Sequence, residues 1–421
     1  MFRVKKIRNK IVEKFLRESS FEIDKLQSYF PILSKFAKRR SNNKFAKICL
    51  DYKIENILDF NPNNTIALIN GEKHTIHIKQ TPLICTLDIF YGRLPDFKSQ
   101  LFLPNNLSKE LIKKINNSHN SAYIELICLF ILNKVNKAQF PILYDYYFGI
   151  SKEYKEIIDD DDLSDDEDLD ELISNGYEIT KEYDSDEEYT LIHPTMPVGI
   201  MIQEKLDKDF DDIYEDVLKN FLSHSKFPRL NAIRKKNFDD KMSAWLMQIL
   251  VALKSANDSI DFVHNDLHIH NVMGKQTEKQ FIIFKLDDKS YKVPTYGWRL
   301  KIIDFGRSTF RINNKLVLGD VFDDDNEAEG QYTKQILPCP SFDLARFACS
   351  FFEDLEEEER QKIFETDTGK LFKNWTISDD NKIDFMKIEG FSLYTEIAKK
   401  FRKKTPSNQI ENLKIFKQFL I

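Results

Sequence analysis

The 421-residue sequence lacks a long hydrophobic run, a signal-like start and paired cysteines. No stretch of eighteen apolar residues is present, so we expect no membrane-spanning helix. The N-terminus reads Met-Phe-Arg-Val-Lys-Lys, without the apolar core of a secretion signal. The five cysteines form no Cys-x-x-Cys pair and their number is odd. These absences favour an intracellular protein in a reducing compartment, with cysteine as a small core residue.

The net charge of −6 is unevenly distributed along the chain. Residues 1–48 are strongly basic, and Ile11, Phe15 and Leu16 follow a helical spacing, so the segment predicts a basic helical N-terminal extension. Its Lys and Arg side chains favour an anionic partner, either nucleic acid or lipid. A solvated helix that packs on the following domain is the alternative.

Acidic residues dominate a second segment, near residues 152–190. Like charges at the density found in 159–168 repel one another and build no core, which predicts a mobile surface insert. Ser164 and Ser185 precede acidic residues and suit modification by an acidophilic kinase. An unmodified, solvated acidic loop is the alternative.

Short β-branched runs dominate the part of the chain before the acidic insert. Residues 65–70 and 74–79 flank Gly71-Glu72-Lys73 and predict a β-hairpin. Residues 121–135 are mostly apolar and predict a largely buried helix. Residues 198–203 predict a further strand after the insert.

Helical periodicity replaces strand patterns in the second half of the chain. Apolar residues at i, i+3, i+4 and i+7 over 242–253 predict an amphipathic helix that ends just before a polar segment. Strands first and helices later predict an α+β fold. We expect a small β-rich lobe over 49–204 and a larger helical lobe over 205–421.

Two polar motifs follow that helix. Residues 262–273 read Phe-Val-His-Asn-Asp-Leu-His-Ile-His-Asn-Val-Met and place Asp266 and Asn271 five residues apart. Further on, the apolar run 300–303 leads into Asp304-Phe305-Gly306. Phosphoryl transfer requires Mg²⁺, neutralised charge and a group that orients the attacking hydroxyl. Carboxylate and amide oxygens suit Mg²⁺, so both motifs are candidates for this chemistry.

The order His-x-Asp-Leu-x-x-x-Asn and then Asp-Phe-Gly resembles the catalytic-loop and metal-loop signature of the protein-kinase family. The resemblance implies a bilobal kinase-like fold that uses ATP and Mg²⁺ to phosphorylate a protein hydroxyl, most simply on Ser or Thr. It implies that Asp266 orients the hydroxyl and accepts its proton, while Asn271 and Asp304 hold Mg²⁺. His264 and Phe305 would support these loops.

The same resemblance requires a lysine on the third strand and a glutamate on the next helix. Lys79 closes the run 74–79 in the place of the lysine of Val-Ala-Ile-Lys, and Glu125 is the acidic residue of the helix 121–135. A carboxylate on an apolar helix needs a partner, because unpaired burial is costly. Lys79, 46 residues away, is the expected partner and phosphate ligand; an ordinary surface lysine is the alternative.

Three further residues are assigned by the resemblance alone. Glu204 and Leu206 would line the adenine of ATP at the hinge. Asp343 would accept hydrogen bonds from the backbone of the catalytic loop. The alternative for Asp343 is an N-terminal helix cap.

A zinc site is the competing interpretation of the first motif. His264, His268 and His270 lie within one short loop and are possible Zn²⁺ ligands of a metallohydrolase. That interpretation leaves Asn271 and Asp304 without a role.

The sequence departs from the kinase pattern in three places. The phosphate-covering segment 59–64 has no glycine, although glycine allows backbone amides to approach phosphate, and this favours a pseudokinase scaffold as an alternative. Asn265 replaces the arginine that pairs with an activation-loop phosphate, so we expect no such switch. His268 replaces a lysine, as in aminoglycoside and choline phosphotransferases, which makes a small-molecule kinase a third hypothesis.

An insertion and a missing motif separate the chain further from that pattern. Residues 275–296 predict an extra hairpin, and the activation segment 304–340 lacks Ala-Pro-Glu. Lys-Val-Pro-Thr-Tyr-Gly at 292–297 and Gln331-Tyr332 resemble divergent kinase-like proteins of large nucleocytoplasmic DNA viruses. This resemblance implies the host cytoplasm or the virion as location.

Overall fold

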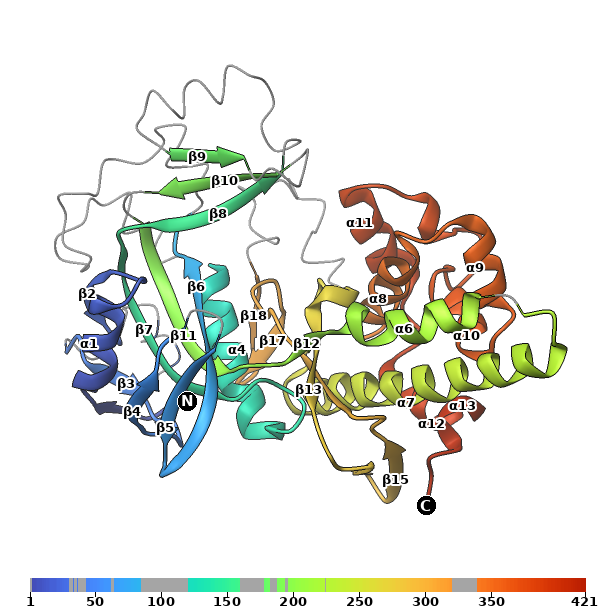
Figure 1. Ribbon diagram of the computed structural model, residues 1–421, viewed down its shortest axis with the longest axis horizontal. Coiled ribbons are helices and arrows are strands. Elements are labelled where there is room, and N and C mark those ends of the chain that lie inside the picture. Colours follow the sequence, from blue (N-terminus) through green and yellow to red (C-terminus); the bar gives the residue numbers. More distant parts are fainter. Residues whose placement is uncertain are drawn as a thin grey trace. The chain divides into compact units, whose positions relative to one another are not determined.

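The computed structural model describes residues 2–29, 33, 36, 43–61, 64–84, 120–159, 178–181, 188–193, 196–223, 225–319 and 339–421 (Figure 1). The chain forms two compact units, which are Met1–Leu126 with Leu143–Lys205, and Ile127–Ile142 with Leu206–Ile421. Helix α4 (Ser121–Asn136) contributes residues to both units. Within the described ranges, no helix has the length and apolar character needed to cross a bilayer.

A six-stranded sheet organises the first unit. Its strand order is β2 (Ile23–Gln27), β7 (Leu143–Ser151), β11 (Met196–Glu204), β6 (Glu72–Pro82), β5 (Thr65–Ile69) and β4 (Ile54–Asp59). All neighbouring strands pair antiparallel. Strands β7 and β11 are buried along almost their whole length, as expected for the central strands of a covered sheet.

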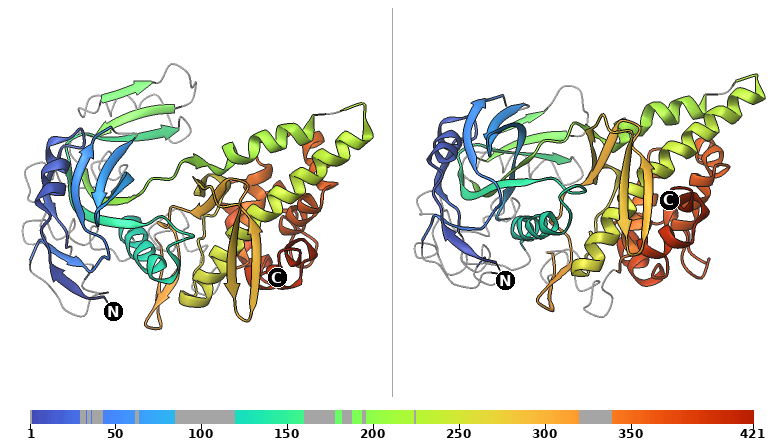
Figure 2. Two further views of the ribbon diagram at one scale, coloured as in Figure 1. Left: turned by 60° about the horizontal axis from the view of Figure 1, so that its bottom comes forward. Right: turned by 90° about the horizontal axis from the view of Figure 1, so that it is seen from below.

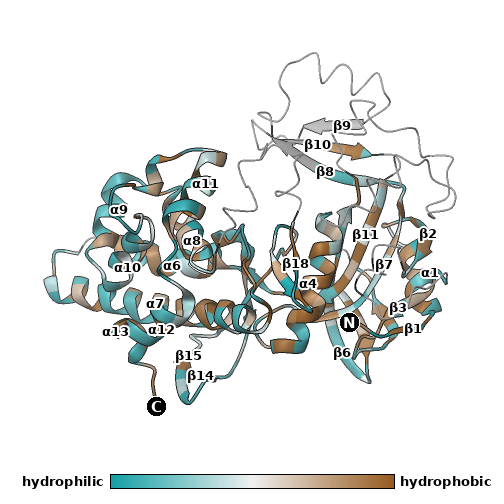
Figure 3. Ribbon diagram, turned by 180° about the vertical axis from the view of Figure 1, so that it is seen from behind, coloured by the Kyte–Doolittle hydropathy of each residue, from teal (hydrophilic) through white to brown (hydrophobic). Residues whose placement is uncertain are grey.

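Helix α4 packs closely on this sheet at its N-terminal end. A Cβ on Gly199 of β11 would lie 3.3 Å from the Cβ of Ala122, so a small residue is needed at the contact. The Tyr123 ring lies 5.5 Å from the Phe148 ring of β7. Figure 3 shows α4 and β11 as mainly hydrophobic ribbons. The prediction of a largely buried helix over 121–135 is confirmed.

The predicted hairpin around Gly71 is also present. Strands β5 and β6 pair from Ile69 with Glu72 onward, which leaves Asn70 and Gly71 as the two turn residues. Their φ angles are 51° and 85°, the positive values that tight hairpin turns require and that asparagine and glycine tolerate best.

The N-terminal segment differs from the expected helical extension. It contains strand β1 (Val4–Lys6), helix α1 (Lys10–Glu18), strand β2 and strand β3 (Ala46–Ile48), and β2 is an edge strand of the main sheet. Lys47 of β3 is buried and pairs with Asp145 of β7. Residues 1–48 are therefore part of the first unit, tied to it by strand pairing and by a buried ion pair.

The acidic insert also has more structure than expected. Strands β8 (Tyr154–Asp159), β10 (Glu188–His193) and β9 (Glu178–Lys181) form a separate antiparallel sheet in that order. The central acidic run, Ser164 and Ser185 lie outside the described residues.

Helices make up most of the second unit. They are α6 (Phe210–Leu222), α7 (Pro228–Ile260), α8 (Phe342–Phe352), α9 (Glu357–Phe364), α10 (Asp367–Trp375), α11 (Phe391–Lys400), α12 (Pro406–Asn412) and α13 (Lys414–Lys417). Aromatic side chains form the core between them; Phe372 of α10 contacts Phe347 and Phe351 of α8. The predicted stripe over 242–253 lies in the buried half of α7.

Short strands complete the second unit. Strands β12 (Lys208–Asp209), β13 (Val272–Gln276) and β16 (Trp298–Ile302) form one sheet. Strands β14 (Phe281–Leu286) and β15 (Lys289–Pro294) form the predicted extra hairpin, and β17 (Phe310–Ile312) pairs with β18 (Lys315–Val317). Residues 320–338 of the activation segment lie outside the described residues. The sheet-rich first unit and helical second unit confirm the α+β, bilobal kinase-like fold.

Gly369 of α10 generates a stability prediction. A Cβ at this position would lie 1.8 Å from the carbonyl oxygen of Ile363, where helix α9 meets α10. Replacing a helical glycine by alanine normally stabilises by up to about 1 kcal/mol. Because this Cβ clashes with backbone, we expect Gly369→Ala instead to lower the free energy of unfolding by roughly 1–3 kcal/mol.

Thermal or urea unfolding followed by circular dichroism measures the effect. Asn374→Ala, at an exposed position of the same helix, is the control and should change stability little. An unchanged or raised melting temperature for Gly369→Ala would contradict the close α9–α10 contact.

Candidate active site

The pairing of β13 with β16 brings the two polar motifs together. The strands are antiparallel, with Val272 opposite Ile302. The loop that precedes β13 and the segment that follows β16 therefore lie at the same end of the sheet. The Ile303 amide donates to the Asn271 carbonyl at 3.0 Å, which closes this junction.

His264 and Phe305 support the junction from within the second unit. His264 Nε2 donates to the Ile303 carbonyl at 2.8 Å, and its ring lies 5.7 Å from the Phe305 ring. Phe305 also contacts the rings of Phe140 and Phe262, and its side chain is almost fully buried. Both residues occupy the packed positions expected for them.

Asp343 of α8 holds the backbone of the catalytic loop. Its Oδ2 accepts from the His264 amide at 2.9 Å, and its Oδ1 accepts from the Asn265 amide at 3.0 Å. Burial raises the pKa of the Asp343 carboxyl to about 6, although His264 and the two amides oppose the rise. Ser341 is the N-cap residue of α8, so Asp343 bonds the loop rather than capping its own helix.

A second residue of α8 anchors the same loop. Ser350 Oγ accepts from the Ile269 amide at 3.0 Å and donates to the Phe347 carbonyl at 2.9 Å. Helix α8 therefore fixes the loop on both sides of Asp266.

Asn265 connects the loop to the segment after Gly306. Its Nδ2 donates to the Arg307 carbonyl at 2.8 Å, and its φ of 68° lies in the left-handed region, which asparagine tolerates. The residue that replaces the usual arginine thus has a structural contact of its own.

Asn271 and Asp304 are the expected metal ligands. Asn271 Nδ2 donates to the Asp266 carbonyl at 2.8 Å and to His268 Nε2 at 2.9 Å, so the amide presents its oxygen as the remaining polar atom. Asp304 has a φ of 59°, a strained conformation for an aspartate that turns the chain directly after β16. An amide oxygen and a carboxylate suit Mg²⁺, so these side chains fit the implied ion.

The Asp266 carboxylate has two contacts that the sequence did not indicate. Tyr394 of α11 donates from its hydroxyl to Oδ1 at 2.8 Å, and Arg307 lies 3.4 Å from Oδ2. Arg346 of α8 donates from Nε to the Tyr394 hydroxyl at 3.1 Å. Arg307 directly follows Asp-Phe-Gly and was open to prediction; Tyr394 lies 128 residues from Asp266 and carries no local signal.

His268 is a neutral imidazole near this carboxylate. Burial lowers its pKa to about 4, despite the opposing effect of Asp266. Nε2 accepts a hydrogen bond from the Asn271 amide, which also requires an unprotonated nitrogen at that atom. The positive charge that a lysine would bring here is supplied by Arg307 and Arg346 instead.

The three histidines of the loop make separate contacts. His264 is engaged with the Ile303 carbonyl and His268 with Asn271, while His270 is half exposed and lies 3.8 Å from Asp211. Within the described part of the chain, no group of three or more His, Cys, Asp or Glu side chains is arranged to hold a metal ion. The three-histidine zinc alternative therefore gains no support.

In the first unit, the expected lysine–glutamate pair is formed. Lys79 Nζ of β6 lies 2.7 Å from Glu125 Oε1 of α4. The Glu125 side chain is only 3% exposed and the Lys79 side chain 26%, so the lysine is partly accessible while its partner is not. Thr81 Oγ1 lies 3.5 Å from the other carboxylate oxygen of Glu125.

Glu204 and Leu206, expected at the adenine, lie at the end of β11 and just after it. Glu204 is the last residue of β11, opposite Ile76 of β6, and Leu206 is the buried first residue after the first unit. Their role at a nucleotide stays a prediction. Residues 62 and 63 of the segment 59–64 lie outside the described residues.

Comparisons with known proteins support a kinase-like assignment at low identity. The chain is 32% identical to mouse serine/threonine-protein kinase haspin over 93 residues, which are 22% of this chain and 12% of the mouse protein. It is 29% identical to the haspin homolog of Drosophila melanogaster over 145 residues, 32% of this chain and 26% of that protein. An uncharacterized protein of Caenorhabditis elegans is 33% identical over 63 residues, 15% of this chain and 21% of its own length.

The chain therefore spans about a tenth to a quarter of the length of the curated relatives it matches. No family model matches it. Among solved structures, ROP2 of Toxoplasma gondii, described as a virulence factor with a protein-kinase fold and no enzymatic activity, has a TM-score of 0.35 and 9% identity. The alignment covers 87% of this chain and 80% of that one, and it is too distant to carry an argument.

The sequence matches and the fold together support a protein-kinase-like family. The resemblance to viral kinases stays a prediction.

Asp343 generates a prediction about the pH dependence of stability. Its pKa rises from 3.8 to about 6 on folding, so between these values the folded chain keeps a proton that the unfolded chain loses. Stability should therefore fall as the pH rises from about 4 to about 6. In Asp343→Asn this contribution disappears, and one loop amide loses its acceptor, so the melting temperature should be lower.

Melting temperatures between pH 4 and 7 test this expectation. Asp354→Asn, an exposed position just after the same helix, is the control and should keep the wild-type profile. An Asp343→Asn profile parallel to the wild-type one would mean that the buried carboxyl has no raised pKa.

Proposed function

We propose that the chain is an ATP- and Mg²⁺-dependent protein kinase that transfers the γ-phosphate to a Ser or Thr hydroxyl of a protein. The observation that carries this proposal is the arrangement at one end of the β13–β16 pair. There the loop with Asp266 and Asn271, held by Asp343 of α8, is joined to the segment with Asp304 by the hydrogen bond from the Ile303 amide to the Asn271 carbonyl. Haspin, the serine/threonine-protein kinase matched by part of the chain, supports the same reaction class.

Asp266 is the proposed group that orients the attacking hydroxyl and accepts its proton. Tyr394 occupies Oδ1 at 2.8 Å, so the hydroxyl of the substrate would bond to Oδ2, where Arg307 is more distant at 3.4 Å. The Asp266 side chain is 18% exposed and is accessible to a substrate at that oxygen. A base held in this way lowers the barrier by fixing geometry before the reaction begins.

The negative charge of the ATP phosphates also needs positively charged partners. Mg²⁺, held by the oxygens of Asn271 and Asp304, would neutralise the phosphates of ATP. Arg307 is half exposed and is the proposed partner of the transferred phosphoryl group, because His268 is neutral. Lys79, oriented by Glu125, would bind the phosphates as a point charge.

A non-enzymatic kinase fold is the second candidate. Two observations favour it: the glycine-free segment 59–64, and the Tyr394 hydroxyl that already donates to the proposed base. The Tyr394 hydroxyl makes the kind of hydrogen bond to Asp266 that a substrate hydroxyl would make, and could therefore compete with the substrate. The two candidates predict different effects on the rate of phosphate transfer when Asp266, Asp304 or Tyr394 is replaced.

Asp266 and Asp304 have separable expected effects. Asp266→Asn should lower kcat about 10²- to 10⁴-fold, because a positioned base is lost. It should keep the thermal shift on adding Mg²⁺-ATP, because a ligand at 100 times its dissociation constant stabilises the folded chain by about 2.7 kcal/mol. Asp304→Asn should lose both the activity and that shift.

Radiolabelled ATP with a mixed protein substrate, beside thermal unfolding, measures both quantities. Asp261→Asn, an exposed carboxylate at the end of α7, is the control and should retain both. A wild-type chain that neither transfers phosphate nor shifts with Mg²⁺-ATP would support the non-enzymatic candidate.

Tyr394→Phe tests whether the Tyr394 hydroxyl orients the Asp266 carboxylate or blocks it. If Tyr394 orients Asp266, losing its hydrogen bond of about 1 kcal/mol should lower kcat about threefold to tenfold and leave the KM for ATP unchanged. Tyr214→Phe on α6, which packs against Phe210 and Phe351, is the matched control. A rise in kcat would show that the hydroxyl blocks the base.

A further inference from the structure

Positive charge is segregated at the turn between α6 and α7. Residues 217–238 contain no Asp or Glu in a chain that has 68 acidic residues. The same stretch contains six basic residues, Lys219, Lys226, Arg229, Arg234, Lys235 and Lys236. Two of them, Lys219 and Lys236, pair with the flanking acids Glu215 and Asp240. The positive end of the dipole of α7 and the negative end of the dipole of α6 meet at this turn, so the positive potential comes from the side chains.

Large apolar side chains are exposed in the same place. Phe227 is 71% exposed, Ile233 56% and Leu230 38%. Their spacing of three residues places them on one side of the first two turns of α7. Isolated exposed apolar residues are common, but three on one helix face within a basic segment form a defined surface. We name residues 223 and 225–237 the α6–α7 tip.

Phe227 is in a position where it does not help the fold. It is the N-cap residue of α7, and no side chain caps this helix. Serine, threonine, aspartate or asparagine at an N-cap stabilises a helix, whereas phenylalanine has no group that accepts the free amides. A residue that breaks a local rule and is also solvent-exposed points to a role outside the folded unit.

The tip is held rigidly by its own hydrogen bonds. Asn231 Nδ2 donates to the Ser225 carbonyl at 2.9 Å, and its Oδ1 accepts from the Ser225 amide at 3.1 Å. Arg234 donates to the Ser223 carbonyl at 2.6 Å. These hydrogen bonds hold the backbone of the turn, and with it the position from which Phe227 points into solvent.

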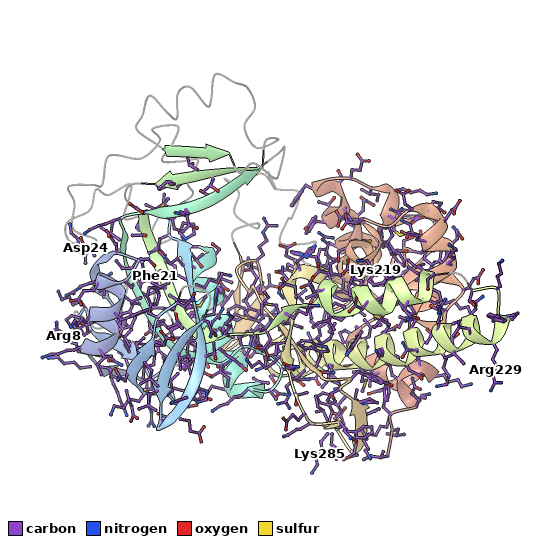
Figure 4. The ribbon with its side chains drawn as sticks, viewed as in Figure 1. Arg8, Phe21, Asp24, Lys219, Arg229 and Lys285 are labelled. Carbon is purple, nitrogen blue, oxygen red and sulfur yellow. The ribbon has the colours of Figure 1, made fainter. Side chains whose placement is uncertain are left out.

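The tip is the outer end of a helical hairpin. Helices α6 and α7 lie side by side, and the turn between them extends beyond the neighbouring helices of the second unit in both views of Figure 2. Figure 4 places Arg229 at this outer end, with its side chain directed away from the helices. Exposed apolar and basic residues therefore share the outer end of this hairpin.

We propose that the α6–α7 tip binds the surface of an anionic lipid membrane. Phe227, Leu230 and Ile233 would enter the boundary between head groups and acyl chains, while Lys226 and Arg229 contact lipid phosphates and carboxylates. A protein partner needs about 800 Å² of matching surface on each side, whereas a membrane needs only exposed apolar side chains with cations beside them. A nucleic acid would leave Leu230 and Ile233 without a partner.

Vesicle co-sedimentation of the full chain tests the proposal independently of any kinase activity. Vesicles of phosphatidylcholine with roughly a third phosphatidylserine should bind the chain, and vesicles of phosphatidylcholine alone should bind it much less. Phe227→Ser/Ile233→Ser should reduce binding about tenfold or more. Serine is a favoured N-cap, so this variant should not lose thermal stability, which separates lost binding from unfolding.

Matched controls come from the β14–β15 hairpin. Phe281 and Ile283 are also exposed, at 43% and 58%, so Phe281→Ser/Ile283→Ser should leave binding unchanged. Lys226→Ala/Arg229→Ala should reduce binding to the anionic vesicles, whereas Lys285→Ala/Lys289→Ala, which removes the same charge elsewhere, should not.

Three outcomes would overturn the proposal. The first is no binding to anionic vesicles. The second is equal binding to both kinds of vesicle. The third is binding that survives the tip variants but is lost with Lys10→Ala/Lys14→Ala, because the basic segment 1–48 would then be the lipid contact.

Discussion

The buried carboxylate of Asp343 is the constraint on which the candidate site depends. A carboxylate without solvent needs partners, and here each oxygen accepts one amide of the catalytic loop. That requirement fixes the backbone of His264 and Asn265, and with it the direction in which Asp266 leaves the loop. The raised pKa of Asp343 shows that two amides offset the cost of burial only partly. Part of the stability of the second unit is thus spent on placing one neighbouring side chain.

Strand pairing does the rest of the positioning. Because β13 and β16 are antiparallel neighbours, the residues before one and after the other must meet at the same end. Asn265 and Asp304 adopt positive φ angles at this meeting point, where the chain turns most sharply. Positive φ angles also occur at other turns of the described chain, but at Asp304 the strained residue is itself a proposed metal ligand.

Local patterns in the sequence were sufficient for the hairpin at Gly71 and the buried helix near 121–135, which depend on turn chemistry and periodicity. The pair formed by Lys79 with Glu125 was predicted from the resemblance to protein kinases together with the lone charge on an apolar helix. Lys47 and Tyr394 were beyond such reasoning. Lys47 is buried only because β3 lies beside Asp145, and Tyr394 reaches Asp266 only through the packing of α11 on α8. Contacts between distant segments leave no spacing to detect.

The replacement of a lysine by His268 in the catalytic loop has to be judged together with the other charged side chains near Asp266. Taken alone, His268 suggests a site poorer in positive charge, and its low pKa makes that loss real at neutral pH. Arg307 and Arg346 lie outside the loop, yet one contacts the Asp266 carboxylate and the other contacts it through Tyr394. Guanidinium groups stay charged at every pH of interest. Arg307 therefore places beside Asp266 a cation whose charge does not depend on burial, whereas Arg346 also pairs with Glu353 at 3.7 Å. The positive charge near Asp266 is thus set by residues outside the motif as well as by residue 268.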